Sequence, residues 1–155
     1  MPNFYGLIKS RENILFKEVK IAENVLYFSF VKRNANNEFI VQNNEGKHNP
    51  PIWVFHDYPT SSTVFRLTGR LDSGLTDTIL SADNPKVVCV FLQPGDEILA
   101  YVKENTGNIA VGDKLTYGDS GHVRPLAEGE FPMGIALESY TTSTDPLQLI
   151  KIEIL

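Results

Sequence analysis

Three histidines are the residues best suited to metal binding or acid–base chemistry: His48, His56 and His122. They lie far apart in the sequence, and none has an H-x-x-x-H or carboxylate spacing around it, so the fold alone would have to assemble a metal site from them. We therefore expect them to be loop or surface histidines and predict that the protein binds no metal.

A catalytic triad could be imagined around His56 and Asp57, with a nucleophile from the following Thr60-Ser61-Ser62. Adjacent residues on an extended strand, however, point to opposite faces, which separates the imidazole from the carboxylate. The sequence does not favour nucleophilic catalysis at this place.

Carboxylate pairs give no better case for catalysis. Asp72 and Asp77 bracket a Ser-Gly pair, and Asp113 and Asp119 bracket a turn, but neither spacing is that of a calcium loop. The chain also has no glycine-rich phosphate loop, no C-x-x-C pair and no G-x-S-x-G motif. These observations predict solvated turn carboxylates, no cofactor and a protein that is not an enzyme.

Aromatic residues could instead form a stacking platform for sugars or bases, because Trp53, Phe55 and Tyr58 are close in the sequence. Trp53 and Phe55 share one face of an extended run, however, as an inward-facing core pair would, and we predict that Trp53 is buried. Phe28 and Phe30 beside Lys32 and Arg33 resemble the pattern of RNA-binding sheets, but the glycine-bearing signature of those sheets is missing.

Composition sets the class of protein. The 155 residues include 14 Lys and Arg against 19 Asp and Glu, a net charge of −5 that disfavours nucleic-acid binding. No apolar run approaches the length of a membrane span, and the first residues are not a targeting segment, so we expect a soluble protein without membrane contact. The single Cys89 lies in an apolar run and excludes an internal disulfide.

Short apolar runs with a period near two would have to position any site, and they predict strands. We expect strands at 25–31, 38–41, 51–55, 63–68, 86–92, 97–102, 133–137 and 150–154. Turn residues such as Pro94-Gly95-Asp96 and Gly118-Asp119-Ser120-Gly121 separate many of these runs, which leaves little room for helices beyond one or two weak turns within 72–82.

The prediction is thus an all-β fold, a small barrel or sandwich, in one domain of residues 1–155. Its core should contain Trp53, Phe65, Val88, Val90, Leu99 and Ile152. Residues 1–12 should form an N-terminal arm, and the Asn-rich stretch 32–50 an exposed hairpin or long loop.

A resemblance rests on three segments of the last third of the chain: Val111-Gly112-Asp113-Lys114-Leu115, Gly121-His122-Val123-Arg124-Pro125-Leu126 and Met133-Gly134-Ile135-Ala136-Leu137-Glu138, followed by a terminal strand. This order resembles the capsid cement, or head decoration, proteins of tailed bacteriophages. In bottom-up terms, residues 112–113 make a turn into a strand, 118–121 close a hairpin, and Gly134 lets the backbone bend where a barrel closes.

The resemblance implies a cement-like β-barrel core over 85–155 and a non-enzymatic protein on the outer surface of the virion. Such a protein binds the major capsid protein between capsomers and stabilises the shell, commonly as a homotrimer and sometimes as a dimer. The motif places no ligand, so no functional residue of the family is transferred to this chain.

Contact residues must therefore come from the exposed segments. We expect Phe4, Tyr5 and Arg11 of the arm and Asn36 and Asn37 of the Asn-rich stretch to contact the capsid or a second subunit, because aromatic residues near a chain end suit an interface. Packing of the arm on its own domain is the open alternative. For the whole protein the alternative is a carbohydrate-binding or adhesion β-sandwich, using Trp53, Tyr58, Tyr140 and the Ser/Thr-rich loops 60–63 and 141–144.

Overall fold

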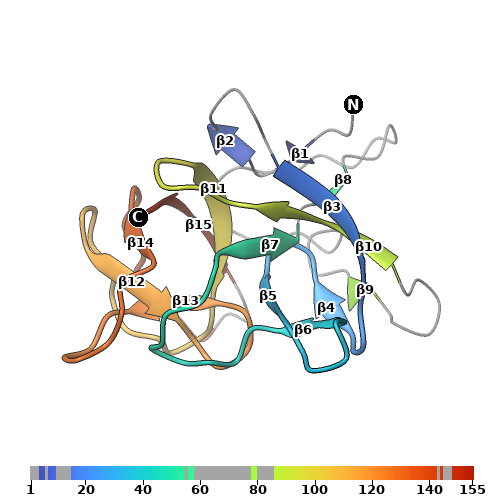
Figure 1. Ribbon diagram of the computed structural model, residues 1–155. Helices are drawn as coiled ribbons and strands as arrows, with labels where there is room; N and C mark the ends of the chain where they lie inside the picture. Colours follow the sequence, from blue (N-terminus) through green and yellow to red (C-terminus); the bar gives the residue numbers. More distant parts are fainter. Residues whose placement is uncertain are drawn as a thin grey trace.

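The computed structural model describes residues 4–5, 7–9, 15–54, 56–57, 78–79, 86–142, 144 and 148–155 (Figure 1). These residues form fifteen strands and contain no helix, which confirms the predicted all-β class. The described part accordingly has no helix that could cross a membrane.

A first sheet has five antiparallel strands. Their order is β3 (Leu15–Lys20), β10 (Lys86–Phe91), β7 (Ile52–Val54), β5 (Phe30–Arg33) and β6 (Phe39–Val41). Ile21, directly after β3, makes a parallel bridge to Phe39 of β6. The sheet therefore curls until its two edge strands meet, and we call it the first barrel.

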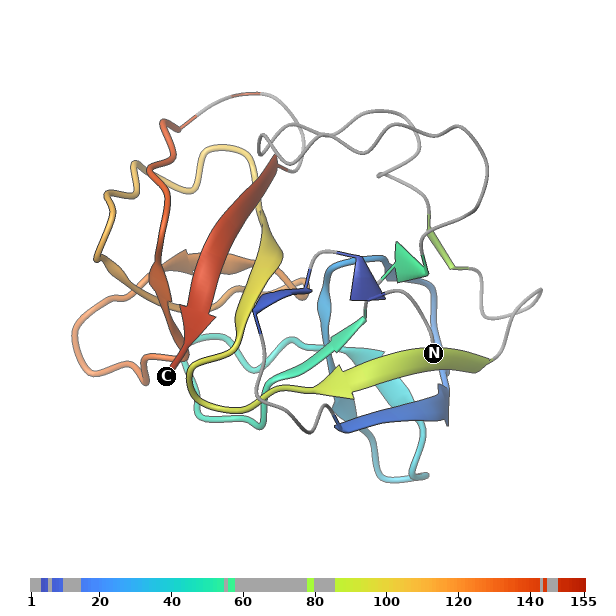
Figure 2. The ribbon, with the colours of Figure 1, turned by 90° about the horizontal axis from the view of Figure 1, so that it is seen from above.

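A second sheet closes in the same way. Its order is β13 (Val123–Pro125), β12 (Lys114–Tyr117), β14 (Gly134–Ala136), β15 (Gln148–Ile154) and β11 (Glu97–Val102), and Val102 of β11 pairs in parallel with Val123 of β13. We call it the second barrel. The two barrels lie side by side (Figure 2). Since β10 belongs to the first sheet, the second barrel begins at Glu97.

Short pairings connect the remaining segments. In the N-terminal segment, β1 (Phe4–Tyr5) pairs with β8 (His56–Asp57), and β2 (Leu7–Lys9) extends the second sheet along β11. β4 (Val25–Leu26) pairs with β9 (Thr78–Ile79).

Two strands replace the single strand that was expected over 25–31. The chain turns at Tyr27 and Phe28 between β4 and β5, and Phe28 has a φ of 67°, in the left-handed region that bulky side chains seldom adopt. Phe28 is nevertheless fully buried, and its N–H donates to the carbonyl of Val54 at 2.5 Å. Tertiary packing of the ring thus overrides the local strand pattern.

The strands expected at 38–41, 51–55, 86–92 and 133–137 are present but shorter by one or two residues. The strand expected at 150–154 begins two residues earlier, at Gln148, and 97–102 is matched in full. The expected strand at 63–68 and most of 72–82 lie outside the described residues. The predicted hairpin at 118–121 joins β12 and β13, with the Gly118 N–H donating to the His122 carbonyl at 2.7 Å. A Cβ at Gly134 would lie 3.0 Å from the Glu153 carbonyl oxygen, which explains glycine where β14 meets β15.

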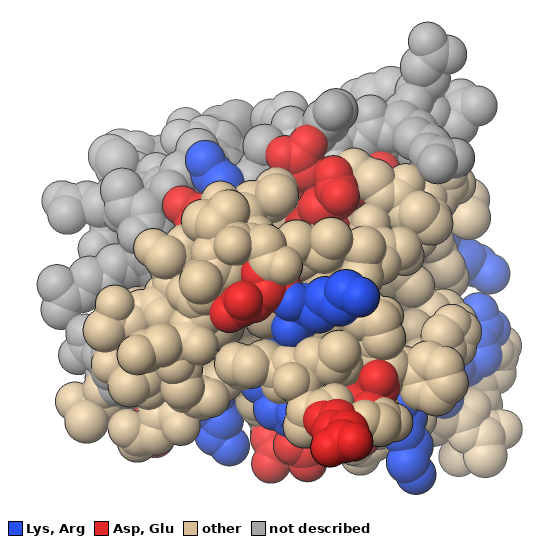
Figure 3. Space-filling view, turned by 90° about the vertical axis from the view of Figure 1, so that its left-hand side faces the viewer, with Lys and Arg blue, Asp and Glu red and all other residues tan. Residues whose placement is uncertain are grey.

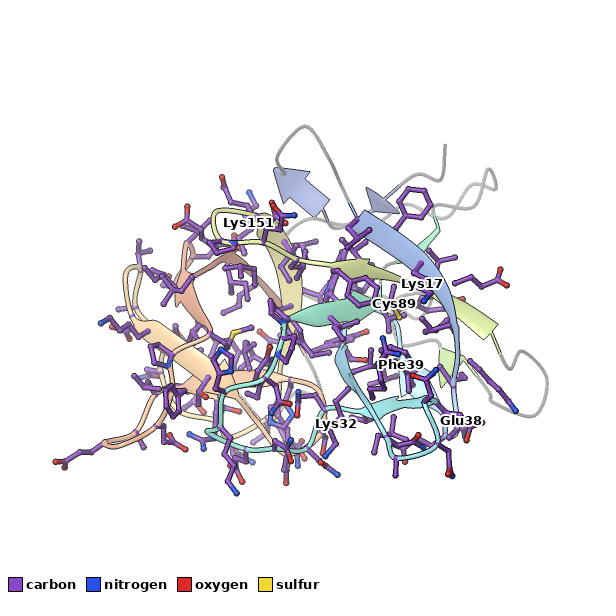
Figure 4. All side chains as sticks on the ribbon, viewed as in Figure 1. Lys17, Lys32, Glu38, Phe39, Cys89 and Lys151 are labelled. Atoms are coloured by element: carbon purple, nitrogen blue, oxygen red, sulfur yellow. The ribbon has the colours of Figure 1, made fainter. Side chains whose placement is uncertain are left out.

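Two hydrophobic clusters follow from the alternation along β7 and β10. Ile52, Val54, Val87 and Cys89 face the interior of the first barrel. Figure 4 shows Cys89 and Phe39 inside that barrel. Trp53 and Val90 point the opposite way and join a larger cluster that also fills the second barrel. Both faces of the first sheet therefore pack into hydrophobic clusters, and the cluster on its outer face is shared by the two barrels.

The expected core residues Trp53, Val90, Leu99 and Ile152 are buried, at 1% exposed or less. Val88 is only partly buried at the margin of the larger cluster, which corrects its assignment to the core. Phe65 lies outside the described residues.

Ile152→Asp should prevent folding. Ile152 is fully buried between Ile98 of β11 and Ala136 of β14, so the substitution forces a carboxylate into an apolar layer. We expect loss of the β-type far-UV circular dichroism spectrum and of a cooperative urea transition. Lys151→Asp, one residue earlier on the opposite and half-buried face, is the matched control and should remain folded. A folded Ile152→Asp protein would contradict the register of β15.

Candidate interaction surface

Four of the five expected contact residues are described, and they fall in two places. Phe4 and Tyr5 form β1 and pair with Asp57 and His56 of the same chain, and Arg11 lies outside the described residues. Asn36 and Asn37 are exposed in the turn that joins β5 to β6, so the Asn-rich stretch does begin with an exposed hairpin.

This hairpin is fixed by its own side chains. The Oδ1 of Asn34 accepts the backbone N–H groups of Asn36 at 3.0 Å and of Glu38 at 2.9 Å, in the way that asparagine stabilises turns. Asn37 has a φ of 61°, a conformation that Asn tolerates better than most residues. The exposed amides of Asn36 and Asn37 are therefore presented on a defined loop.

Arg33, at the base of the hairpin, is held on two sides. Its Nη1 donates to Oδ1 of Asn37, and its guanidinium lies over the Phe39 ring, 5.1 Å from the ring centre. Such a cation–π contact orients the guanidinium without neutralising its charge.

A hollow of about 410 Å³ opens beside this arginine, at one end of the first barrel. It is lined by Lys32, Arg33, Asn44, Asn49, Pro50, Ile52 and Phe91. Sequence reasoning missed this hollow because its residues come from three strands and a loop. It combines two cationic side chains with the apolar side chains of Pro50, Ile52 and Phe91.

A smaller hollow of about 110 Å³ is lined in part by residues of the 47–51 segment. Phe131 and Leu155 at its margin are 57% and 43% exposed, and His48 contacts the Phe131 ring edge-on. His48 is thus the surface histidine that was expected.

His122, by contrast, is buried, which corrects the expectation of a surface position. Its Nε2 lies 3.8 Å from Oδ1 of Asp119, and its Nδ1 is buried without a hydrogen-bond partner. Burial lowers the pKa of His122, and the nearby Asp119 carboxylate opposes that shift only in part. The residue in the sequence that could have indicated this burial is Gly118. A Cβ at that position would lie 2.1 Å from the His122 Nε2, so the imidazole packs where only glycine leaves room.

Arg124 joins the 42–46 segment to the β12–β13 hairpin. Its Nε donates to Glu45 at 2.8 Å, and Nη1 and Nη2 reach the two oxygens of Glu130 at 2.8 and 2.5 Å. These contacts raise the pKa of Arg124, chiefly through the Glu130 hydrogen bonds, and lower the pKa of Glu130. Such bidentate pairing fixes the loop geometrically.

The remaining candidate groups take structural positions. Asp113 accepts the Ala110 N–H within a turn, as expected of a turn carboxylate. Trp53, Phe28 and Phe30 are fully buried and Tyr140 is 4% exposed, so none of them offers a stacking face. Among the described residues no three His, Cys, Asp or Glu side chains gather as a metal site would require.

Comparisons with known proteins show a likeness of fold. No protein-family model and no curated protein sequence matches the chain. A solved structure does: the N base of the head fiber protein gp8.5 of bacteriophage phi29, with a TM-score of 0.55 over 92% of this chain and 95% of that chain. The sequences are 16% identical, so the likeness is one of fold.

We expect acid to destabilise the protein through His122. Its folded pKa lies below the value of about 6.5 in an unfolded chain, so the unfolded state binds more protons and the free energy of unfolding falls as the pH drops through about 6.5. One such group changes this free energy by at most about 1.4 kcal/mol per pH unit. His122→Gln should flatten the dependence in urea titrations between about pH 5 and about pH 8. An unchanged slope in that variant would contradict the assignment.

Proposed function

We propose that the protein is a non-enzymatic structural component of a bacteriophage head, bound to the outer surface of the capsid between capsomers. The observation that carries the proposal is the fold, which is similar over nearly its whole length to the base of a phage head fiber. The cement-like order of segments over residues 111–138 supports it independently, because those segments form β12, β13 and β14 of one barrel.

Stabilisation of a shell requires several simultaneous contacts. A weak contact to each of several copies of the major capsid protein becomes a tight grip in an oligomer, since later contacts form at a high effective concentration. We therefore propose a homotrimer, with a dimer as the alternative. The proposal includes no nucleic acid, membrane or cofactor as a partner. Static light scattering of the purified protein measures the oligomeric state.

Contacts to the capsid would use the hairpin tip at Asn36 and Asn37 and the N-terminal segment with Phe4, Tyr5 and Arg11. Residues Leu7–Lys9 already pair with Glu97 and Ile98 of β11, so this segment can form strands on a sheet edge. Addition of a strand to a neighbouring sheet supplies main-chain hydrogen bonds without a particular side chain.

A head-fiber base is the second candidate, favoured by the description of the phi29 protein. Cryo-electron microscopy of the particle separates the two candidates, because a cement protein lies flat at capsomer joints and a fiber base carries a projecting fiber. The carbohydrate-binding alternative loses support, since Trp53 and Tyr140 are buried.

Deleting residues 1–12 should abolish decoration of capsids while leaving a folded β protein. The deletion removes the proposed N-terminal contacts together with two short strands, β1 with its pairing to β8 and β2 at the edge of the second sheet. Binding to capsids that lack the protein can be measured by co-sedimentation, and Asn36→Ala with Asn37→Gly tests the hairpin separately, with glycine preserving the positive φ.

Capsids without the protein should also release their DNA at a lower temperature than decorated capsids. Undiminished thermal and osmotic stability of bare capsids would contradict the cement role, and normal decoration by the truncated protein would remove the N-terminal segment from it.

A further inference from the structure

A row of apolar side chains forms the bottom of the hollow at the end of the first barrel. In the strand register Ile52 of β7 lies opposite Phe91 of β10, and Phe91 lies opposite Leu15 of β3. Directly opposed residues project from the same face of a sheet, so these side chains form a row across three strands. Exposure rises along the row, from 6% at Ile52 to 58% at Leu15. The row therefore runs from the hollow outward onto the surface.

Two cations lie at the inner end of this row. The Lys32 ammonium donates to the Asn44 Oδ1 at 3.1 Å, which leaves two of its N–H groups for another acceptor. Arg33 is positioned by Asn37 and Phe39, neither of which neutralises it. Among the described residues neither cation forms an ion pair, and no carboxylate lines the hollow.

The charge of the hollow is opposite in sign to the net charge of the molecule. The chain carries a net charge of −5, and on the face shown in Figure 3 acidic and basic side chains alternate over short distances. The hollow instead combines two cations, two amides and an apolar floor. A complementary ligand therefore needs both carboxylates and an apolar side chain.

We infer that this hollow binds an acidic, extended polypeptide segment. One apolar side chain of the segment contacts Ile52, Phe91 and Pro50, and a carboxylate beside it accepts hydrogen bonds from Lys32 and Arg33. With strands about 4.8 Å apart, the row from β7 to β3 spans about 10 Å, the length of three or four extended residues. A simple inorganic anion would leave the apolar floor unused, and two cations are too few for a nucleic-acid groove.

The inference rests on the proposed function in one respect only, the protein that supplies the acidic segment. If the protein binds a capsid, that segment is an exposed acidic loop of the capsid. It also assigns a further task to Asn37, whose Oδ1 orients the Arg33 guanidinium. The hairpin and the hollow thus become one surface.

Nuclear magnetic resonance titration of the full-length, ¹⁵N-labelled protein tests the inference without the capsid. The probe is the capped peptide Asp-Glu-Leu-Phe-Glu-Asp, and its neutral counterpart is Asn-Gln-Leu-Phe-Gln-Asn. We expect shift changes centred on Lys32, Arg33, Asn44 and Phe91, and affinity at least about tenfold weaker for the neutral peptide, as loss of a charge-assisted hydrogen bond predicts. Equal binding of both peptides, changes centred elsewhere, or no change at about 1 mM peptide would overturn it.

Variants supply the second measurement. The double variant Lys32→Gln with Arg33→Gln should bind the acidic peptide with an affinity lower by about tenfold or more. The charge-matched pair Lys114→Gln with Lys151→Gln, on β12 and β15 of the second barrel, should leave its affinity unchanged. Equal weakening by both pairs would show a general charge effect and overturn the site.

Capsid binding separates this inference from the proposed function. If the unmodified protein decorates capsids and the Lys32→Gln, Arg33→Gln protein decorates them equally well, the hollow is not the contact and the inference fails. If the unmodified protein binds the acidic peptide in the hollow but no capsid, the proposed function fails and the peptide site stands. Tighter binding of single-stranded DNA than of the peptide at these cations would overturn the choice of ligand.

Discussion

The indole N–H of Trp53 is the interaction on which the rest of the structure depends. It donates to the carbonyl of Phe28 and to that of Leu99, both at 3.1 Å, and so connects the chain before β5 and strand β11 of the second barrel to the centre of the first sheet. Buried carbonyls that lose such a donor are costly, which makes the position of this ring specific. The ring also packs against Phe28, and Phe30 packs edge-on against Tyr117 of β12. Aromatic contacts therefore continue the connection across the shared core.

Closure of the two barrels follows from strand number. With β2 left aside, each sheet contributes five strands with antiparallel neighbours to its barrel. The first and last of these five strands run in the same direction, so each barrel must close through a parallel pair. Each sheet has such a bridge, Ile21 with Phe39 and Val102 with Val123. A closed sheet leaves few free edges, and contact with other molecules then falls to loops, barrel ends and the N-terminal strands.

The sequence was sufficient for the fold class and for most strands, because period-two runs such as Ile150–Ile154 encode one buried and one wetter face. It was insufficient where both faces are buried: the run Val87–Leu92 does not reveal that alternate residues enter two different clusters. Phe28 and His122 were misjudged for a related reason, since packing partners far along the chain decide both positions. The hollow could not be predicted at all, because strand register alone brings Ile52, Phe91 and Lys32 together.

A shared core has a mechanical consequence for the proposed role on a capsid. If the barrels could hinge, a load applied at the hairpin of the first barrel would rotate that barrel instead of reaching contacts made by the second, and simultaneous contacts would lose their effective concentration. The hydrogen bond from Trp53 to Leu99 and the contact of Arg124 with Glu45 oppose such a hinge at two separate places. This rigidity does not depend on the identity of any particular residue at the partner-facing surface. The residues of that surface can therefore differ according to the partner.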